Sequence, residues 1–138
     1  MYKYLRSREY LLELAFVASL TALLHYVALV NFLYWNVDWF DIMMHFLGGA
    51  TIGLLAMFLF FTSKYFPSIS ILRQNKTAVF LIIILFTAVI GLGWELWEIF
   101  YGFSNIFTDK TDMIIDLVMD MFGALAVFFL EINKNKKV

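Results

Sequence analysis

The hydrophobic and polar positions divide the 138-residue chain into four long apolar stretches joined by short polar segments. The stretches cover about residues 11–34, 39–61, 77–100 and 113–130. None of them alternates apolar and polar residues as a half-buried strand does. Each is close to the ~20 residues that an α-helix needs to cross ~30 Å of hydrocarbon. The pattern therefore predicts four transmembrane helices.

The composition of the chain places these helices in lipid. The chain is 63% apolar and 15% charged, whereas soluble domains average about 45–50% and about 25%. A chain of this length leaves roughly a third of its unfolded surface exposed, so it cannot hide that much apolar area in its own core. We expect an all-α membrane protein, integral to the plasma membrane, that forms one four-helix transmembrane domain over residues 1–138.

Net charge and cysteine content exclude two classes of function. The net charge is −1, so the chain lacks the basic surface that nucleic acid requires, and we expect no nucleic-acid partner. The chain contains no cysteine, which excludes disulfides and metal sites built on thiolates.

Basic residues indicate the orientation in the membrane. Nine of the ten Lys and Arg residues lie before the first helix, in the second loop or at the C-terminus. Four membrane passes bring these three regions to one side. Because Lys and Arg are enriched on the cytoplasmic side, we predict that the N- and C-termini are cytoplasmic.

Acidic residues gather near the opposite, outer ends of three predicted helices. Counted from the helix ends at ~1.5 Å per residue, they share one layer within roughly 12 Å of the membrane boundary. Each helix carries two ionisable residues spaced three or four apart, which places both on one face. The pairs are Asp41 with His45, Glu95 with Glu98, and Asp116 with Asp120.

This acidic layer needs a counter-charge, because an acid at the centre of a membrane helix costs ~2.5–3.5 kcal/mol on insertion scales. The outer side offers a single basic residue, Lys110. Carboxylates with one imidazole form a hard ligand set, which favours Mg²⁺ or Mn²⁺ and leaves Zn²⁺ or Fe²⁺ as alternatives. Glu95 or Glu98 would also serve as a catalytic general base. The predicted metal ligands are Asp41, His45, Glu95, Glu98, Asp116 and Asp120.

Three sequence elements, in order, are similar to a known group of membrane proteins. They are the segment WFDIMMHFLGG at 39–49, the segment WELWE at 94–98, and the acidic segment 109–120 followed by Gly123. Together they resemble the small VanZ-like and YjdF-like integral membrane proteins. The VanZ-like branch is associated with glycopeptide resistance, so the resemblance implies a role in the cell envelope or on lipid-linked substrates.

The first function hypothesis is a metal-dependent hydrolase or transferase that acts on a lipid-linked phosphate or an envelope lipid, with membrane lipid as its partner. Two alternatives stay open: a small proton or cation transporter, and an accessory subunit with a structural polar network. The motif Gly49-x-x-x-Gly53 favours close helix packing and suggests a homodimer. His25, on the first helix, is predicted to be a core histidine bonded to a backbone carbonyl.

Overall fold

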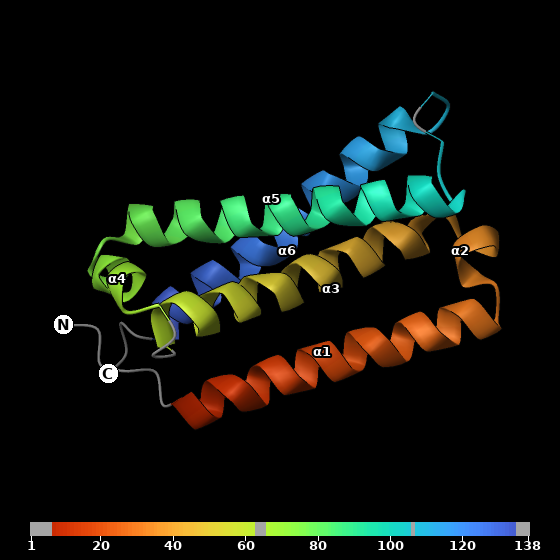
Figure 1. Ribbon diagram of the computed structural model, residues 1–138. Helices are drawn as coiled ribbons and strands as arrows, with labels where there is room; N and C mark the ends of the chain where they lie inside the picture. Colours follow the sequence, from red (N-terminus) through yellow and green to blue (C-terminus); the bar gives the residue numbers. More distant parts are fainter. Residues whose placement is uncertain (1–6, 63–65, 106, 135–138) are drawn as a thin grey trace.

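The computed structural model describes residues 7–62, 66–105 and 107–134, which form helices joined by turns (Figure 1). It confirms an all-helical fold in which four helices are long and apolar enough to span a membrane. These helices are α1 (Ser7–Val30), α3 (Asp38–Met57) with its π-helical continuation η1 (Phe58–Thr62), α5 (Lys76–Tyr101) and α6 (Lys110–Lys134). Shorter helices lie in the connections, namely α2 (Leu33–Asn36), α4 (Pro67–Ser70) and the 3-10 helix η2 (Ile71–Gln74).

The first apolar stretch does not form one continuous helix. The pattern predicts a helix that reaches about residue 34, but α1 ends at Val30. The side chain of Asn31 donates from Nδ2 to the carbonyl oxygen of Val27 at 2.8 Å. Phe32 follows in a left-handed conformation, with φ of 56°, which costs an L-residue roughly 1–2 kcal/mol. The chain turns at this point, and α2 is a separate short helix.

Helix α5 carries sequence signals for both of its ends. The Asn75 side chain accepts hydrogen bonds from the backbone N–H groups of Thr77 (3.0 Å) and Ala78 (3.2 Å). These bonds satisfy two of the donors that the start of a helix leaves unpaired. Gly102 ends the helix with φ of 77°, a left-handed conformation that glycine adopts freely. The resulting bounds place Glu95 within two turns of the outer end.

Helix α3 is the centre of the bundle and packs most extensively against α6 (Figure 1). Glycines allow the two backbones to approach closely. A Cβ atom added to Gly49 would lie 2.5 Å from the Cα atom of Asp120. A Cβ atom added to Gly123 would lie 2.7 Å from the backbone nitrogen of Ala50. Small residues of this kind are what helices in lipid use for close contact.

The predicted glycine motif therefore packs within one chain. Gly49 and Gly53 both face α6, and a Cβ atom at Gly53 would lie 2.9 Å from the Cα atom of Ala124. The expectation that Gly49-x-x-x-Gly53 forms a homodimer surface is wrong, because α6 of the same chain covers this face. A homodimer stays a prediction that would need a different surface.

Helix α1 lies at the edge of the bundle, alongside α3 (Figure 1). The hydroxyls of Thr21 and Thr51 are 3.3 Å apart across this contact. At one end of the bundle, Lys134 Nζ of α6 donates to both carboxylate oxygens of Glu13 of α1 (2.8 and 2.7 Å) and to Glu131 Oε1 (2.6 Å). The start of α1 and the end of α6 thus share this end, as four membrane passes require. We call it the inner end and the opposite end the outer end.

The outward faces of the long helices are apolar. Phe16 on α1, Leu85 on α5 and Phe122 on α6 are all exposed. In water, such extended apolar surface would drive association. In a bilayer it is the expected lipid-facing surface, which agrees with the four candidate membrane spans.

Candidate metal centre

His45 lies at the centre of a group of carboxylates near the outer end of the bundle. Its Nδ1 atom is 3.3 Å from Asp120 Oδ1. Its Nε2 atom is 3.8 Å from Asp41 Oδ1 and 3.8 Å from Asp116 Oδ2. His45, Asp116 and Asp120 are buried, whereas the Asp41 side chain is 36% exposed. We call these four residues the His45 cluster.

The helix crossing described above builds this cluster. His45 and Gly49 are one turn apart on α3, and Asp120 and Gly123 are about one turn apart on α6. The close approach at the glycines therefore brings the imidazole and the Asp120 carboxylate together. On α5, a Cβ atom added to Gly91 would lie 2.6 Å from Asp120 Oδ2. Glycine at this position leaves room for the second oxygen of the carboxylate.

Three members of the cluster are arranged as ligands of a single metal ion would be. One ligand atom each from Asp41, His45 and Asp116 lies within 4.8 Å of the others. Atoms that each lie ~2.0–2.4 Å from one ion are at most about 4.8 Å apart, so the three can share an ion. Asp120 interacts with the other ring nitrogen of His45, which suits an orienting carboxylate better than a fourth ligand.

Glu95 of α5 brings an unpaired carboxylate to the same layer. It is 2% exposed, and neither of its oxygens has a hydrogen-bond partner in the described part of the chain. It lies near enough to His45, Asp120 and Asp41 for electrostatic interaction. Asp116 Oδ1 is also buried and has no hydrogen-bond partner among the residues that the structure describes. Because buried polar atoms are nearly always hydrogen-bonded, these oxygens indicate a bound cation, a proton or water.

Glu98, the remaining predicted ligand, lies at the rim of the layer. It is half-buried, and its Oε1 atom accepts a hydrogen bond from Trp94 Nε1 at 2.9 Å. Asp41 and His45 are within electrostatic range. The structure therefore brings all six predicted residues to one end of the bundle, but it groups only Asp41, His45 and Asp116 as a set of ligand atoms.

Within the described residues, no ion pair links this layer to a lysine or arginine. The lysine ion pairs that the structure describes join Lys134 to Glu13 and Glu131, at the inner end. The imidazole of His45 is the group that pairs with the outer carboxylates. A single imidazole cannot neutralise four or five carboxylates, so the layer keeps its need for further positive charge.

His25 has a different partner from the one that we predicted. Its Nδ1 atom is 2.7 Å from the Tyr34 hydroxyl, so the expectation of a bond to a backbone carbonyl is wrong. The ring of Trp94 also approaches His25 edge-on, with centroids 6.5 Å apart. The pairing depends on the turn at Phe32, which folds α2 back beside α1. The residue spacing along the chain gives no signal for this turn.

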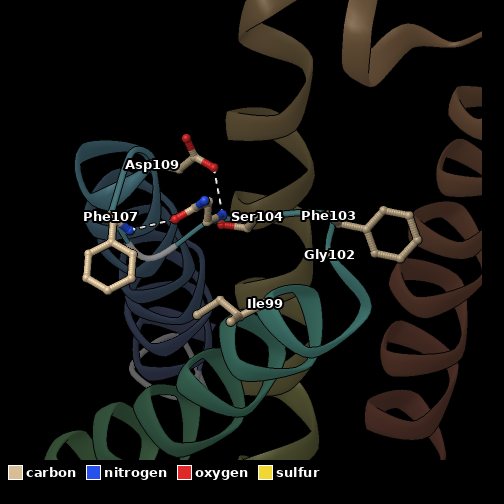
Figure 2. Close-up of a pocket in the computed structure, with 7 residues that line it drawn as sticks. Ile99, Gly102, Phe103, Ser104, Phe107 and Asp109 are labelled. Atoms are coloured by element: carbon tan, nitrogen blue, oxygen red, sulfur yellow. Dashed lines mark hydrogen bonds between the residues drawn. The ribbon is translucent and has the colours of Figure 1, made fainter.

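A shallow hollow of about 480 Å³ lies nearby in the loop between α5 and α6. Figure 2 shows that this loop is held by its own hydrogen bonds. Asn105 N–H donates to Asp109 Oδ2 (2.7 Å), and Phe107 N–H donates to Asn105 Oδ1 (2.9 Å). Hydrogen bonds from Thr108 and from the Asn105 backbone lower the pKa of Asp109. None of the predicted metal ligands lines the hollow, so it is separate from the His45 cluster.

Comparison with known proteins identifies the family but supplies no activity. No curated protein matches the chain, and no solved structure matches it. The family described as "Predicted membrane protein (DUF2238)" matches residues 8–136, which include every helix of the bundle except the first residue of α1. With four candidate membrane spans and a match over nearly its whole length, the chain belongs to this DUF2238 family of predicted membrane proteins.

Proposed function

We propose that this membrane protein binds a divalent cation, Mn²⁺ or Mg²⁺, at the outer end of the bundle. The ligand atoms are Asp41 Oδ1, His45 Nε2 and Asp116 Oδ2. The observation that carries the proposal is that Asp41, His45 and Asp116 each offer one ligand atom within 4.8 Å of the others. They do so in a layer whose buried carboxylates have no lysine or arginine partner among the described residues. A divalent cation supplies the positive charge that such a layer requires.

Asp120 prepares His45 for this role. When Nδ1–H donates to Asp120 Oδ1, the lone pair of Nε2 faces Asp41 and Asp116. We assign this tautomer from the hydrogen bond, since a metal-binding histidine commonly donates its other N–H to a carboxylate. Asp120 is therefore an orienting residue, and the proposed ligand set is smaller than the six residues expected from the sequence.

The chemistry of the ligands favours a hard cation. Two carboxylates and one imidazole suit Mn²⁺ or Mg²⁺ better than softer ions, with Zn²⁺ and Fe²⁺ as the rivals. Glu95 has two oxygens in the same buried layer that no described residue hydrogen-bonds. It can take a further coordination position or accept a proton from a cation-bound water, as a general base does.

The proposed substrate is a lipid-linked phosphate. The Asp41 side of the cluster is partly exposed, so the oxygen of a phosphate group can complete the coordination of the cation there. A cation that bridges carboxylates and phosphate is the usual arrangement in metal-assisted phosphoryl chemistry. The depth of the site and the resemblance to VanZ-like and YjdF-like proteins support a lipid-linked substrate. With such a substrate on the cation, the activity that we propose is that of a hydrolase or transferase.

Cation binding is tested on the purified protein in detergent. We expect Mn²⁺ to bind by isothermal titration calorimetry, and EDTA to lower the melting temperature. A cation at one hundred times its Kd stabilises the folded state by ~2.7 kcal/mol. Asp116→Asn should weaken binding at least tenfold, because it removes a ligand. The control Asp38→Asn changes an exposed acid outside the cluster and should bind like the wild type.

The same experiments can refute the proposal. A wild-type protein that binds no Mn²⁺, Mg²⁺, Zn²⁺ or Fe²⁺, and whose melting temperature is indifferent to EDTA, would leave the cluster as a structural polar network. The lipid step has its own test. A short-chain phosphatidic acid should tighten Mn²⁺ binding to the wild type and should release inorganic phosphate in the presence of Mn²⁺, whereas Asp116→Asn should do neither. If Mn²⁺ binds but phosphatidic acid has no effect, the cation site stands and the phosphate substrate does not.

A further inference from the structure

The turn between α1 and α2 brings Tyr34 within electrostatic range of Asp41, the partly exposed member of the His45 cluster. The hydroxyl of Tyr34, on α2, lies 2.7 Å from His25 Nδ1. The Tyr34 ring also packs edge-on against Phe40 of α3, with centroids 5.6 Å apart and planes at 86°. Phe40 directly precedes Asp41, one of the proposed ligands. Tyr34 is thus held by contacts to α1 and α3.

The electrostatic surroundings of Tyr34 indicate where its proton points. Burial, and then the carboxylates of Asp41 and Glu98, raise the pKa of Tyr34 to about 12. The phenol therefore keeps its proton at neutral pH. Phenol lone pairs directed at two carboxylates would be repelled, whereas an O–H directed at them is attracted. This arrangement leaves the phenol oxygen as the acceptor of a hydrogen bond from His25 Nδ1–H.

We propose that Tyr34 is a positioning residue of the cation site. His25 Nδ1–H donates to the Tyr34 oxygen, and Tyr34 O–H donates to the oxygen ligand, water or phosphate, that binds the cation beside Asp41. The inference rests on the proposed cation site and adds α1 and α2 to it.

Two neighbouring features support this role. Trp94 of α5 contacts His25 edge-on and donates to Glu98 Oε1 at 2.9 Å, so it links His25 to the rim of the acidic layer. The left-handed conformation of Phe32 is unfavourable for a bulky residue, and such strain persists where the surrounding structure holds it. Here the bond between His25 and Tyr34 spans the strained turn.

The test compares Mn²⁺ affinity among matched variants at neutral pH. Tyr34→Phe and His25→Leu should each weaken Mn²⁺ binding about tenfold to a hundredfold, as the loss of an outer-shell partner typically does. His25→Asn should retain most of the affinity, because its amide can still donate near the Nδ1 position. The control Tyr26→Phe removes a hydroxyl from an exposed position on α1, next to His25, and should leave the Mn²⁺ affinity unchanged. The metal-free melting temperature of each variant is measured in parallel.

Water-proton relaxation of the Mn²⁺-loaded protein gives a second readout. Tyr34→Phe should change it if the hydroxyl holds a metal-bound water, and a purely structural tyrosine would leave it unchanged. If the wild type binds Mn²⁺ and Tyr34→Phe binds it as well as Tyr26→Phe does, this inference is overturned while the cation site stands. A Tyr34→Phe protein that melts earlier but keeps its Mn²⁺ affinity also overturns it. A wild type that binds no Mn²⁺ instead refutes the proposed function itself.

Discussion

Replacing Gly49 with alanine tests the helix contact that builds the His45 cluster. The added Cβ atom would lie 2.5 Å from both the Cα atom and the carbonyl carbon of Asp120. The carbonyl oxygen of Asp120 would lie closer still. Such contacts become ordinary at 3.4 Å, so α3 and α6 must separate locally by at least about 0.9 Å. Because the obstructing atoms belong to the backbone, no change of side-chain rotamer can relieve the clash.

The expected magnitude follows from two opposing effects. Overpacking of a close contact costs ~1–3 kcal/mol, and sometimes more. Alanine returns up to ~1 kcal/mol, because it favours a helix over glycine. We therefore expect Gly49→Ala to destabilise the fold by about 1–2 kcal/mol. His45 Nδ1 lies 3.3 Å from Asp120 Oδ1, and the same separation of the helices would lengthen this distance to roughly 4 Å, beyond hydrogen-bond distance. Because Asp120 would then no longer orient His45, Mn²⁺ affinity should also fall.

Gly93→Ala on α5 is the matched control, because a Cβ atom there would meet nothing within 4 Å. The helix preference alone then applies, and Gly93→Ala should be neutral or more stable. Thermal unfolding in detergent, without metal, compares the two variants, and calorimetry measures Mn²⁺ binding. If both variants melt at the same temperature and bind Mn²⁺ equally, the close crossing of α3 and α6 is not what positions Asp120.

Other contacts of the bundle give three further predictions. Gly91→Ala should lower the free energy of Mn²⁺ binding more than the free energy of unfolding, because its Cβ would press on the movable Oδ2 atom of Asp120, 2.6 Å away. Equal losses of the two free energies, measured by calorimetry and thermal unfolding, would contradict this. Lys134→Met should lower the free energy of unfolding by ~1–3 kcal/mol, measured by chemical denaturation, because it removes a charged partner from buried Glu131. Single cysteines at Ser68 and Ser104 should react with an impermeant maleimide from opposite sides of the membrane, because α4 and the α5–α6 loop lie at opposite ends of the bundle (Figure 1). Labelling of both from one side would refute the four-pass arrangement.

The layer of acids was predictable because lipid restricts where charge can lie. Residues three or four apart on a helix share a face, and distance from the helix end gives depth. These two rules place Asp41, Glu95 and Asp116 at one level without any knowledge of the fold. The outer end of α5 was also predictable, because the helix ends at a glycine, Gly102, which adopts the left-handed conformation there.

The partners within that layer could not be predicted by the same rules. A glycine motif shows that Gly49 and Gly53 allow close packing, but it does not say which helix packs there, and α6 of the same chain does. The distinction between a ligand and an orienting carboxylate depends on which ring nitrogen of His45 each Asp approaches. The bond between His25 and Tyr34 depends on a left-handed turn at Phe32, which a bulky residue does not signal.

The pairing of α3 with α6 has a consequence for biosynthesis. His45 and its partner Asp120 are 75 residues apart in the chain. At ~5–20 residues per second, the ribosome needs about 4–15 s to make the intervening segment. For the later part of that interval α3 (Asp38–Met57) is complete, while its imidazole and its glycine face lack their final partner. Of the four long helices, α6 is thus made last and completes the core. A chain that stops before α6 would leave His45 and the face of α3 that carries it open to lipid or to membrane chaperones.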